Sequence, residues 1–505
     1  MNTQSLLKDA KADTLKQALG IQTLSGGERF DALFSKQLIT DKKILQERQD
    51  IVLKYKEKPS SIHSLHESLF QEVQTIEPIL KSILVPSSLE KESMEQILFS
   101  KNPHLQILNT IPFLLLCVSL WKQYIVPLLA VFMPIFFFII PYLTMKYYYN
   151  LPIDLGQYTK IFCVTLGIPA SLDHLQWKQT FQLVFTSVSI GQSIYQPIQT
   201  SYHIQSIDKE LQEKTKALLK LKTIFETMYP EKKELLEDFT DSDSYRSFAS
   251  GWDFPYRIQL ALWMIGDLEV IHKIALHSSI KPVCFHTKNF VKMVDLVNPL
   301  LKTTTPISFL LTPKRSHCLM TGPNGGGKST VLRCILINIV FAQTLGVCFG
   351  TSSGTYSLHP FDWIQSGLQL QDLPGQLSMF EREVEFSSQA LHRARKYPKQ
   401  RGMLLFDELF HSTNPPDGER TATLFLKQIW SFSHMSSFIS THVFSLAESS
   451  PSSVQKLCVP AEEKENGELH FTYRLQSGIC KVSSVDLVLK KRGFFPPGKP
   501  EVKQE

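Results

Sequence analysis

A glycine-rich segment of the chain has the spacing of a phosphate-binding loop. Residues 322–329 read Gly-Pro-Asn-Gly-Gly-Gly-Lys-Ser, which matches the pattern G-x-x-x-x-G-K-[ST]. An apolar run at 317–320 precedes the loop and a helical pattern follows it, so a chance glycine-rich turn is a poor alternative. Backbone N–H groups in such a loop turn toward phosphate, and the helix N-terminus favours anions. The predicted nucleotide-binding residues are Gly322, Pro323, Asn324, Gly325, Gly326, Gly327, Lys328, Ser329 and Thr330.

A pair of carboxylates supplies the second part of the expected chemistry. The apolar strand 403–406 ends in Asp407 and Glu408. Lys328 is expected to reach the β- and γ-phosphates of ATP, while Ser329 and Asp407 hold Mg²⁺. Glu408 would polarise the attacking water. The sequence therefore predicts ATP and Mg²⁺ as cofactors and Glu408 as a catalytic residue.

A third apolar strand, 437–441, ends at His442. A histidine in this position could sense the γ-phosphate, and we predict His442 as a second catalytic residue. The alternative is a histidine with a structural role only.

These motifs together resemble one family. Segments 321–330, 404–409 and 440–444 resemble the ATPase domain of the MutS mismatch-repair family, and segments 38–50 and 265–275 resemble the start and end of its helical core, or lever, domain. The resemblance implies an α/β P-loop ATPase domain of the ABC type preceded by an all-α lever domain. It also implies an ATP-dependent homodimer, or a heterodimer with a related chain.

The family's signature segment is also present. Asp372-Leu373, Ser378, Phe380 and Glu383 resemble the segment that contacts ATP in the partner subunit. By this resemblance Ser378 would be a nucleotide-binding residue that acts across the dimer.

Two departures from the family affect the expected function. The usual Gly-Arg-Gly after the carboxylate pair is replaced by Phe410-His411-Ser412, a form similar to divergent MutS-like proteins that carry a membrane segment. The chain also starts at the core domain, so the mismatch-reading domain is expected to be missing. We therefore expect any DNA binding to be weak and insensitive to a mispair.

Residues 105–149 form a hydrophobic segment. Between Ile111 and Met145 the only charged residue is Lys122, and the uncharged part from Tyr124 onward is long enough to cross a bilayer. We expect a transmembrane helical hairpin that turns at 122–124, with 105–121 as its first arm. One alternative is a single crossing, which would separate residues 1–104 from the ATPase domain and so prevent the two halves of the core from packing together. The other alternative is a helical pair buried in a soluble core.

Composition and hydrophobic patterning indicate the class of the protein and its domain boundaries. The 505 residues, 43% hydrophobic and 20% charged with a net charge of +6, fit a folded protein of several domains. The eight scattered cysteines and the first thirty residues, which lack an apolar stretch, suggest an intracellular protein. We expect it at a membrane, with the ATPase on the cytoplasmic or nucleoplasmic side. The predicted domains are 1–104 (first part of the helical core), 105–149 (hairpin), 150–290 (rest of the core), 291–494 (ATPase) and 495–505 (disordered tail).

Two functions of different classes agree with these features. The first is a DNA-directed ATPase whose dimer moves helical levers around DNA. The second is a membrane-anchored mechanochemical ATPase without mismatch recognition.

Overall fold

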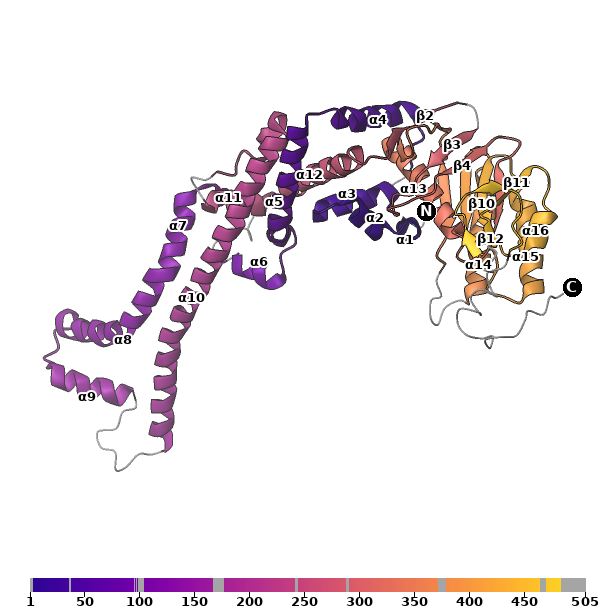
Figure 1. The fold of residues 1–505 in the computed structure, drawn as a ribbon. Coiled ribbons are helices and arrows are strands. Elements are labelled where there is room, and N and C mark those ends of the chain that lie inside the picture. The colour runs from indigo at the N-terminus through magenta and orange to yellow at the C-terminus, as the bar shows by residue number, and fades with distance from the viewer. Residues whose placement is uncertain are drawn as a thin grey trace, which may run out of the picture. The chain divides into compact units, whose positions relative to one another are not determined.

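The computed structural model describes residues 3–35, 38–94, 96, 98, 104–166, 177–240, 244–287, 290–370, 378–463 and 469–482. The chain divides into two compact units, which we call unit 1 (residues 1–70 with 265–505) and unit 2 (residues 71–264). The boundaries fall within helices α5 (Ser60–Leu84) and α12 (Pro255–Ala275). The expected mixture of a large helical part and an α/β part is confirmed, but residues 1–70 belong to the unit that contains the α/β part (Figure 1). The predicted tail, 495–505, lies outside the described residues.

A six-stranded sheet is the centre of unit 1. Its strand order is β14-β11-β5-β10-β9-β8, and β11, β5, β10, β9 and β8 run parallel. Every residue of β5, β9 and β10 is buried, as expected for a parallel sheet covered on both faces. The strands are β5 (His317–Thr321), β8 (Trp363–Gly367), β9 (Gly402–Phe406), β10 (Met435–Ser440), β11 (Val454–Cys458) and β14 (Gln476–Ser477).

Alternate residues of β5 reach the two faces of this sheet. Cys318 and Met320 join the core that contains helix α13 (Lys328–Leu345), whereas Leu319 joins the core on the other face. That second face is covered by α14 (Met379–Lys396), α15 (Pro415–Ile429) and α16 (Phe444–Glu448).

A smaller sheet and two strand pairs complete the α/β part. The four-stranded sheet has the order β2-β7-β3-β4, and β1 pairs with β6 and β12 with β13. These strands are β1 (Ile280–Pro282), β2 (Cys284–Phe285), β3 (Val291–Leu296), β4 (Ile307–Leu311), β6 (Val347–Phe349), β7 (Tyr356–Leu358), β12 (Ala461–Glu463) and β13 (Leu469–Phe471).

The N-terminal helices pack on α13. Their bounds are α1 (Thr3–Asp9), α2 (Ala12–Leu19), α3 (Leu24–Ser35) and α4 (Lys42–Lys56). Phe30 and Phe34 of α3 contact the ring of Phe341 in α13, with centroids 6.0 and 5.9 Å away. At the end of α13, Arg48 of α4 donates to the Thr344 carbonyl at 2.9 Å.

Unit 2 is helical throughout the part that the structure describes. Besides the ends of α5 and α12 it contains α6 (Ser88–Met94), η1 (Gln106–Thr110), α7 (Pro112–Leu120), η2 (Trp121–Ile125), α8 (Val126–Leu143), η3 (Thr144–Tyr148), α9 (Leu155–Thr165), α10 (Trp177–Met228), η5 (Pro230–Leu236) and α11 (Ser244–Asp253). The apolar stripe in the second half of α10 is buried: Ile204, Ile207, Leu211, Leu218, Leu221 and Phe225.

The expected turn at residues 122–124 is wrong. Trp121–Ile125 forms a π-helical segment, so α7, η2, α8 and η3 make one helix from Phe113 to Tyr148. The charge of Lys122 does not require a turn, because its ammonium already has a hydrogen-bond acceptor: the Gln96 carbonyl, at 2.5 Å. Of the most apolar stretch of this helix, only 6% is buried, which also contradicts the alternative of a buried helical pair.

Candidate active site

The glycine-rich loop connects β5 to α13, as its context in the sequence predicts. Gly327 has φ 99°, in the left-handed region, and caps the start of α13. At Gly322 an added Cβ would lie 2.7 Å from the Val459 carbonyl oxygen, so a larger residue would collide with the backbone. The loop shape therefore depends on glycine at both of its ends.

Lys328 is the first residue of α13 and its side chain is buried. Its ammonium donates to the carbonyls of Gly322 and Pro323, at 2.9 and 3.0 Å, across the loop that precedes it. Burial lowers the pKa of Lys328, while the negative charges of Glu408 and Asp407 oppose that shift. The cation thus lies beside the loop and within the electrostatic reach of both carboxylates.

The two carboxylates follow β9 and are tied to the end of the neighbouring strand β10. The Ser440 hydroxyl donates to Asp407 Oδ1 and accepts from the Glu408 N–H at 2.8 Å. The Leu409 N–H donates to the Ser440 carbonyl at 3.2 Å. Because β10 lies between β5 and β9, these bonds hold the acidic pair at the same sheet edge as the glycine-rich loop.

His442 contacts the expected base. Its Nε2 lies 3.1 Å from Glu408 Oε1, and this hydrogen bond is the main reason that the pKa of Glu408 is lowered. Burial of Glu408 opposes the shift, whereas the charges of His442, His411 and Lys328 add to it. Glu408 is therefore held as an ionised carboxylate, the form that can accept a proton.

A second histidine contact was not found by the sequence reasoning. His411 Nδ1 lies 3.0 Å from Oε1 of Glu383, a buried carboxylate on α14, and 2.9 Å from the Glu408 carbonyl oxygen. The Ser412 hydroxyl donates to Glu383 at 2.8 Å, and burial is the main cause that raises the pKa of Glu383. The replacement of Gly-Arg-Gly by Phe-His-Ser was the sequence feature that could have drawn attention to His411. Only the fold shows that its partner, Glu383, comes from α14.

The structure gives Ser378 a local role. It is the N-cap of α14: its hydroxyl accepts from the Glu381 N–H at 3.3 Å, and Glu381 Oε2 accepts from the Ser378 N–H at 2.9 Å. This capping box leaves the predicted role of Ser378 across a dimer untested. Asp372 and Leu373 lie outside the described residues.

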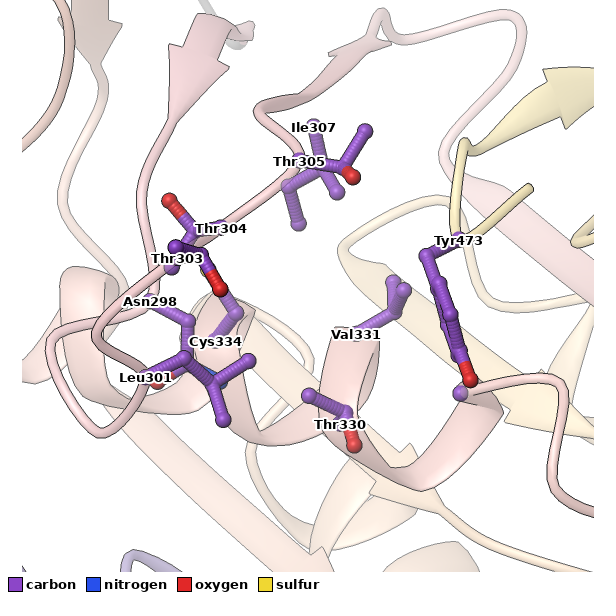
Figure 2. A pocket seen from close by; sticks show the side chains of 11 residues that line it. Asn298, Leu301, Thr303, Thr304, Thr305, Ile307, Thr330, Val331, Cys334 and Tyr473 are labelled. Atoms are coloured by element: carbon purple, nitrogen blue, oxygen red, sulfur yellow. The ribbon is translucent and has the colours of Figure 1, made fainter. Parts of the chain in front are cut away.

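A cavity of about 510 Å³ adjoins the loop (Figure 2). Thr330 and Val331 of α13 line it, between Leu301 from the β3–β4 connection and the ring of Tyr473. Tyr473 also lies against the loop, because a Cβ added at Gly327 would be 3.2 Å from its ring. The cavity has the size of a small-ligand site and opens beside the phosphate-binding loop.

The donors present fit Mg²⁺ but no closed protein metal site. Within the described residues no group of three or more His, Cys, Asp or Glu side chains could hold a metal ion. Mg²⁺ is usually bound by one or two carboxylates together with substrate phosphates and water. The half-exposed Ser329 and Asp407 offer oxygen donors of that kind.

Comparison with known proteins identifies the same part of the chain. The family model for MutS domain V matches residues 318–496. The DNA mismatch repair protein MutS of Bacillus cereus (strain G9842) is 29% identical over 241 residues, which cover 45% of this chain and 26% of that protein. MutS of Leuconostoc mesenteroides is 30% identical over 164 residues, covering 32% and 18%. The chain spans about a quarter or less of the length of the curated relatives it matches.

Proposed function

The chain belongs to the MutS family through its domain V, and from that premise we propose that it binds MgATP at the glycine-rich loop and hydrolyses it. The observation that carries the proposal is the contact between Glu408 and His442 at the sheet edge where Lys328 meets the loop. Family membership alone would leave the catalytic base unassigned. The hydrogen-bonded pair supports Glu408, an ionised carboxylate, as that base.

The roles follow from the positions of the side chains. The Lys328 ammonium exchanges its two carbonyl acceptors for phosphate oxygens, which are stronger acceptors. Ser329 and Asp407 would hold Mg²⁺, and a bound Mg²⁺ would supply positive charge beside the phosphates. The cavity between Leu301 and Tyr473 receives the base and ribose.

Glu408 acts on the attacking water. It accepts a hydrogen bond from the water as the water oxygen bonds to the γ-phosphorus and the bond from phosphorus to the leaving ADP oxygen breaks. The water proton passes to Glu408 and then to the product phosphate. His442 holds the carboxylate in position and stabilises its ionised form.

Two variants test this assignment. Lys328→Ala removes a buried cationic donor, and we expect ATP affinity to fall roughly 100-fold. Glu408→Gln should retain ATP binding while single-turnover hydrolysis falls roughly 10²- to 10⁴-fold. Lys314→Ala and Glu462→Gln, which change exposed residues, are the matched controls. Normal turnover in the Glu408 variant would refute the assignment of the base.

The active form is proposed to be a dimer, homomeric or with a related chain, in which Ser378 completes the site of the partner. Mixing Lys328→Ala chains with Ser378→Ala chains should then restore activity, because one of the two composite sites is intact. Since Ser378 caps α14, Ser378→Thr serves as a control that retains the cap. Full activity of a monomer would exclude this arrangement.

DNA binding is proposed only from similarity, because the relatives are named DNA mismatch repair proteins. We expect weak affinity that falls with salt, as phosphate contacts require, and no preference for a mispair. Titration of matched and mismatched duplexes at the same salt tests this. A tenfold preference for the mismatch would contradict it.

A second candidate role is attachment to a membrane. The Phe113–Tyr148 helix is long and apolar enough to cross a bilayer and is almost unburied in unit 2. Partition of the full chain between detergent and aqueous phases tests this role separately from ATP hydrolysis. Recovery of the full chain in the aqueous phase would exclude it.

A further inference from the structure

Unit 2 contains a second uncharged helical arm beside the one that the sequence indicates. The first arm, residues 123–145, is bounded by Lys122 and Lys146. The second arm, residues 179–207 of α10, is bounded by Lys178 and Asp208 and contains no Asp, Glu, Lys or Arg. Its hydropathy alone does not mark it as a membrane span, because Ser, Thr and Gln are frequent in it.

Large apolar side chains of both arms point into solvent. On α8 they occupy consecutive positions, so they surround the helix axis: Val131, Phe132, Met133, Ile135, Phe136, Phe137, Ile139 and Ile140. On α10 the exposed ones are Phe181, Val184, Phe185, Val188, Ile190 and Tyr195. A helix that docks on a protein partner is apolar on one stripe and polar elsewhere, whereas α8 is apolar all round. The surroundings that suit it are lipid.

Two hydroxyl groups of the second arm have partners within the helix. The Ser193 hydroxyl donates to the Ile190 carbonyl at 2.8 Å, and the Thr200 hydroxyl donates to the Gln196 carbonyl at 2.9 Å. Such bonds satisfy hydroxyl groups where water is absent. Uncharged Ser and Thr are therefore compatible with an apolar environment around α10.

The inner ends of the two arms are joined. The Ser201 hydroxyl donates to the Gln123 carbonyl at 2.5 Å, and the Gln123 amide donates to Ser119 at 2.9 Å. Just inside this level, Leu115 of α7 and Ile204 of α10 are fully buried in unit 2. The packed core of the unit thus ends where both uncharged arms begin.

Aromatic residues mark both ends of each arm. At the inner end Trp121, Tyr124 and Tyr202 are exposed, and at the outer end Tyr147 and Trp177 are exposed. From Tyr124 to Tyr147 is about 34 Å of helix, and from Trp177 to Tyr202 about 37 Å, at 1.5 Å per residue. Tilt and the bends allowed by prolines shorten these spans toward the roughly 30 Å of a bilayer core. Tyr and Trp concentrate at the two interfaces of a membrane.

The connection between the arms folds back on the first arm. The Tyr158 hydroxyl of α9 donates to the Phe138 carbonyl at 2.8 Å, and the ring of Phe162 lies 5.0 Å from that of Phe138. In Figure 1 α8, α9 and the start of α10 form the purple end of unit 2, away from α11. Helix α9 therefore lies at the outer end of both arms.

We propose that α8 and the first half of α10 are both embedded in a lipid bilayer, which they enter from the same face. This inference rests on the second candidate role, membrane attachment, and adds that α10 is the returning arm. Helix α9 then lies at the opposite face, and α10 passes out of the membrane before Asp208.

The test uses the full chain with vesicles of phosphatidylcholine and phosphatidylglycerol that contain a lipid with a photoreactive acyl chain. We expect lipid adducts within residues 126–143 and 181–199 and none within 209–228. Adducts confined to 126–143 would overturn the role of α10 while membrane attachment stands. Failure of the chain to float with vesicles would overturn both. Chain-to-chain crosslinks through 181–199 without lipid adducts would show that a second copy covers this surface.

Matched variants sharpen the test. Val188→Glu changes an exposed residue in the second arm, and Thr223→Glu changes an exposed residue in the aqueous half of the same helix. Both should fold, since neither side chain is buried. We expect at least a tenfold loss of vesicle affinity for Val188→Glu and no change for Thr223→Glu. Equal affinities for the two variants would refute the proposal.

Discussion

Among the described residues, two helices are long and apolar enough to cross a membrane, and the structure places them in opposite surroundings. In α13, 89% of the most apolar stretch is buried, whereas in the Phe113–Tyr148 helix 6% is buried. The difference lies in what surrounds each helix. α13 is covered by a sheet, by α3 and by α4, while α8 is contacted by α9 and α10 and most of its large apolar side chains stay exposed. Hydropathy identifies a helix that avoids water, and packing decides what replaces the water.

A charge placed in each helix should produce the largest contrast. Leu336 of α13 is fully buried, and Leu336→Lys should reduce the free energy of unfolding by roughly 5 kcal/mol or more, since no partner offsets the desolvated ammonium. Phe136 of α8 is 43% exposed, and Phe136→Lys should leave the unfolding of unit 1 unchanged while weakening membrane attachment. Thermal unfolding of both variants in the same mild detergent measures this. Equal destabilisation would mean that α8 is covered by protein.

Removal of one aromatic ring from each helix gives a smaller contrast. Phe341→Ala removes a ring that contacts Phe30, Phe34 and Phe349, and should cost about 3–5 kcal/mol. Phe137→Ala changes a side chain that is 66% exposed and should cost less than about 0.5 kcal/mol. Denaturant titration gives both values. A large loss from Phe137→Ala would reveal packing on α8 that the structure lacks.

The smallest expected effect is the pH dependence of the free energy of unfolding, which involves a buried histidine of unit 1. Burial lowers the pKa of His317, in the central strand β5, to about 4, against 6.5 for a free histidine. Between these values the unfolded chain binds the proton and the folded chain does not. The free energy of unfolding therefore falls as pH drops from about 6.5 to 4, by at most about 1.4 kcal/mol per pH unit.

His317→Asn should reduce that slope, measured by denaturant titration across this pH range. His66 and His359, whose pKa values are also lowered to about 4, will keep part of it. The exposed His470→Asn is the matched control and should leave the slope intact. An unchanged slope in His317→Asn would contradict the assignment.

Local patterns explain how much of the site could be predicted from the sequence. The order strand, glycine-rich loop and helix, and an acidic pair at the end of another buried strand, are short-range features, and the structure has both. Parallel strands bring such ends to one edge, so Lys328 and Glu408 were expected to be neighbours. The capping box of Ser378 with Glu381 is also a local pattern.

Contacts between distant segments could not be predicted in this way. The bond between His411 and Glu383 depends on where α14 packs, which no local spacing specifies. The turn expected at Lys122 is absent because the helix continues through a π-helical segment, and the Lys122 ammonium finds its acceptor in a carbonyl of another segment. The first half of α10 was not recognised as a candidate second arm because its Ser and Thr residues lower its hydropathy, although it contains no Asp, Glu, Lys or Arg.

The contact of α1 with the α/β part has a consequence for the order of folding. The Leu368 N–H donates to Asp9 Oδ2 at 3.1 Å, across 359 residues of sequence. At roughly 5–20 residues per second, a ribosome needs about 20–70 s to make the chain between these two residues. During that interval the apolar residues of α1–α3 have no α13 to cover them, while α8 and the first half of α10 have already been synthesised. The core of unit 1 therefore cannot be completed until late in synthesis, although the first helices of that core are made at the start.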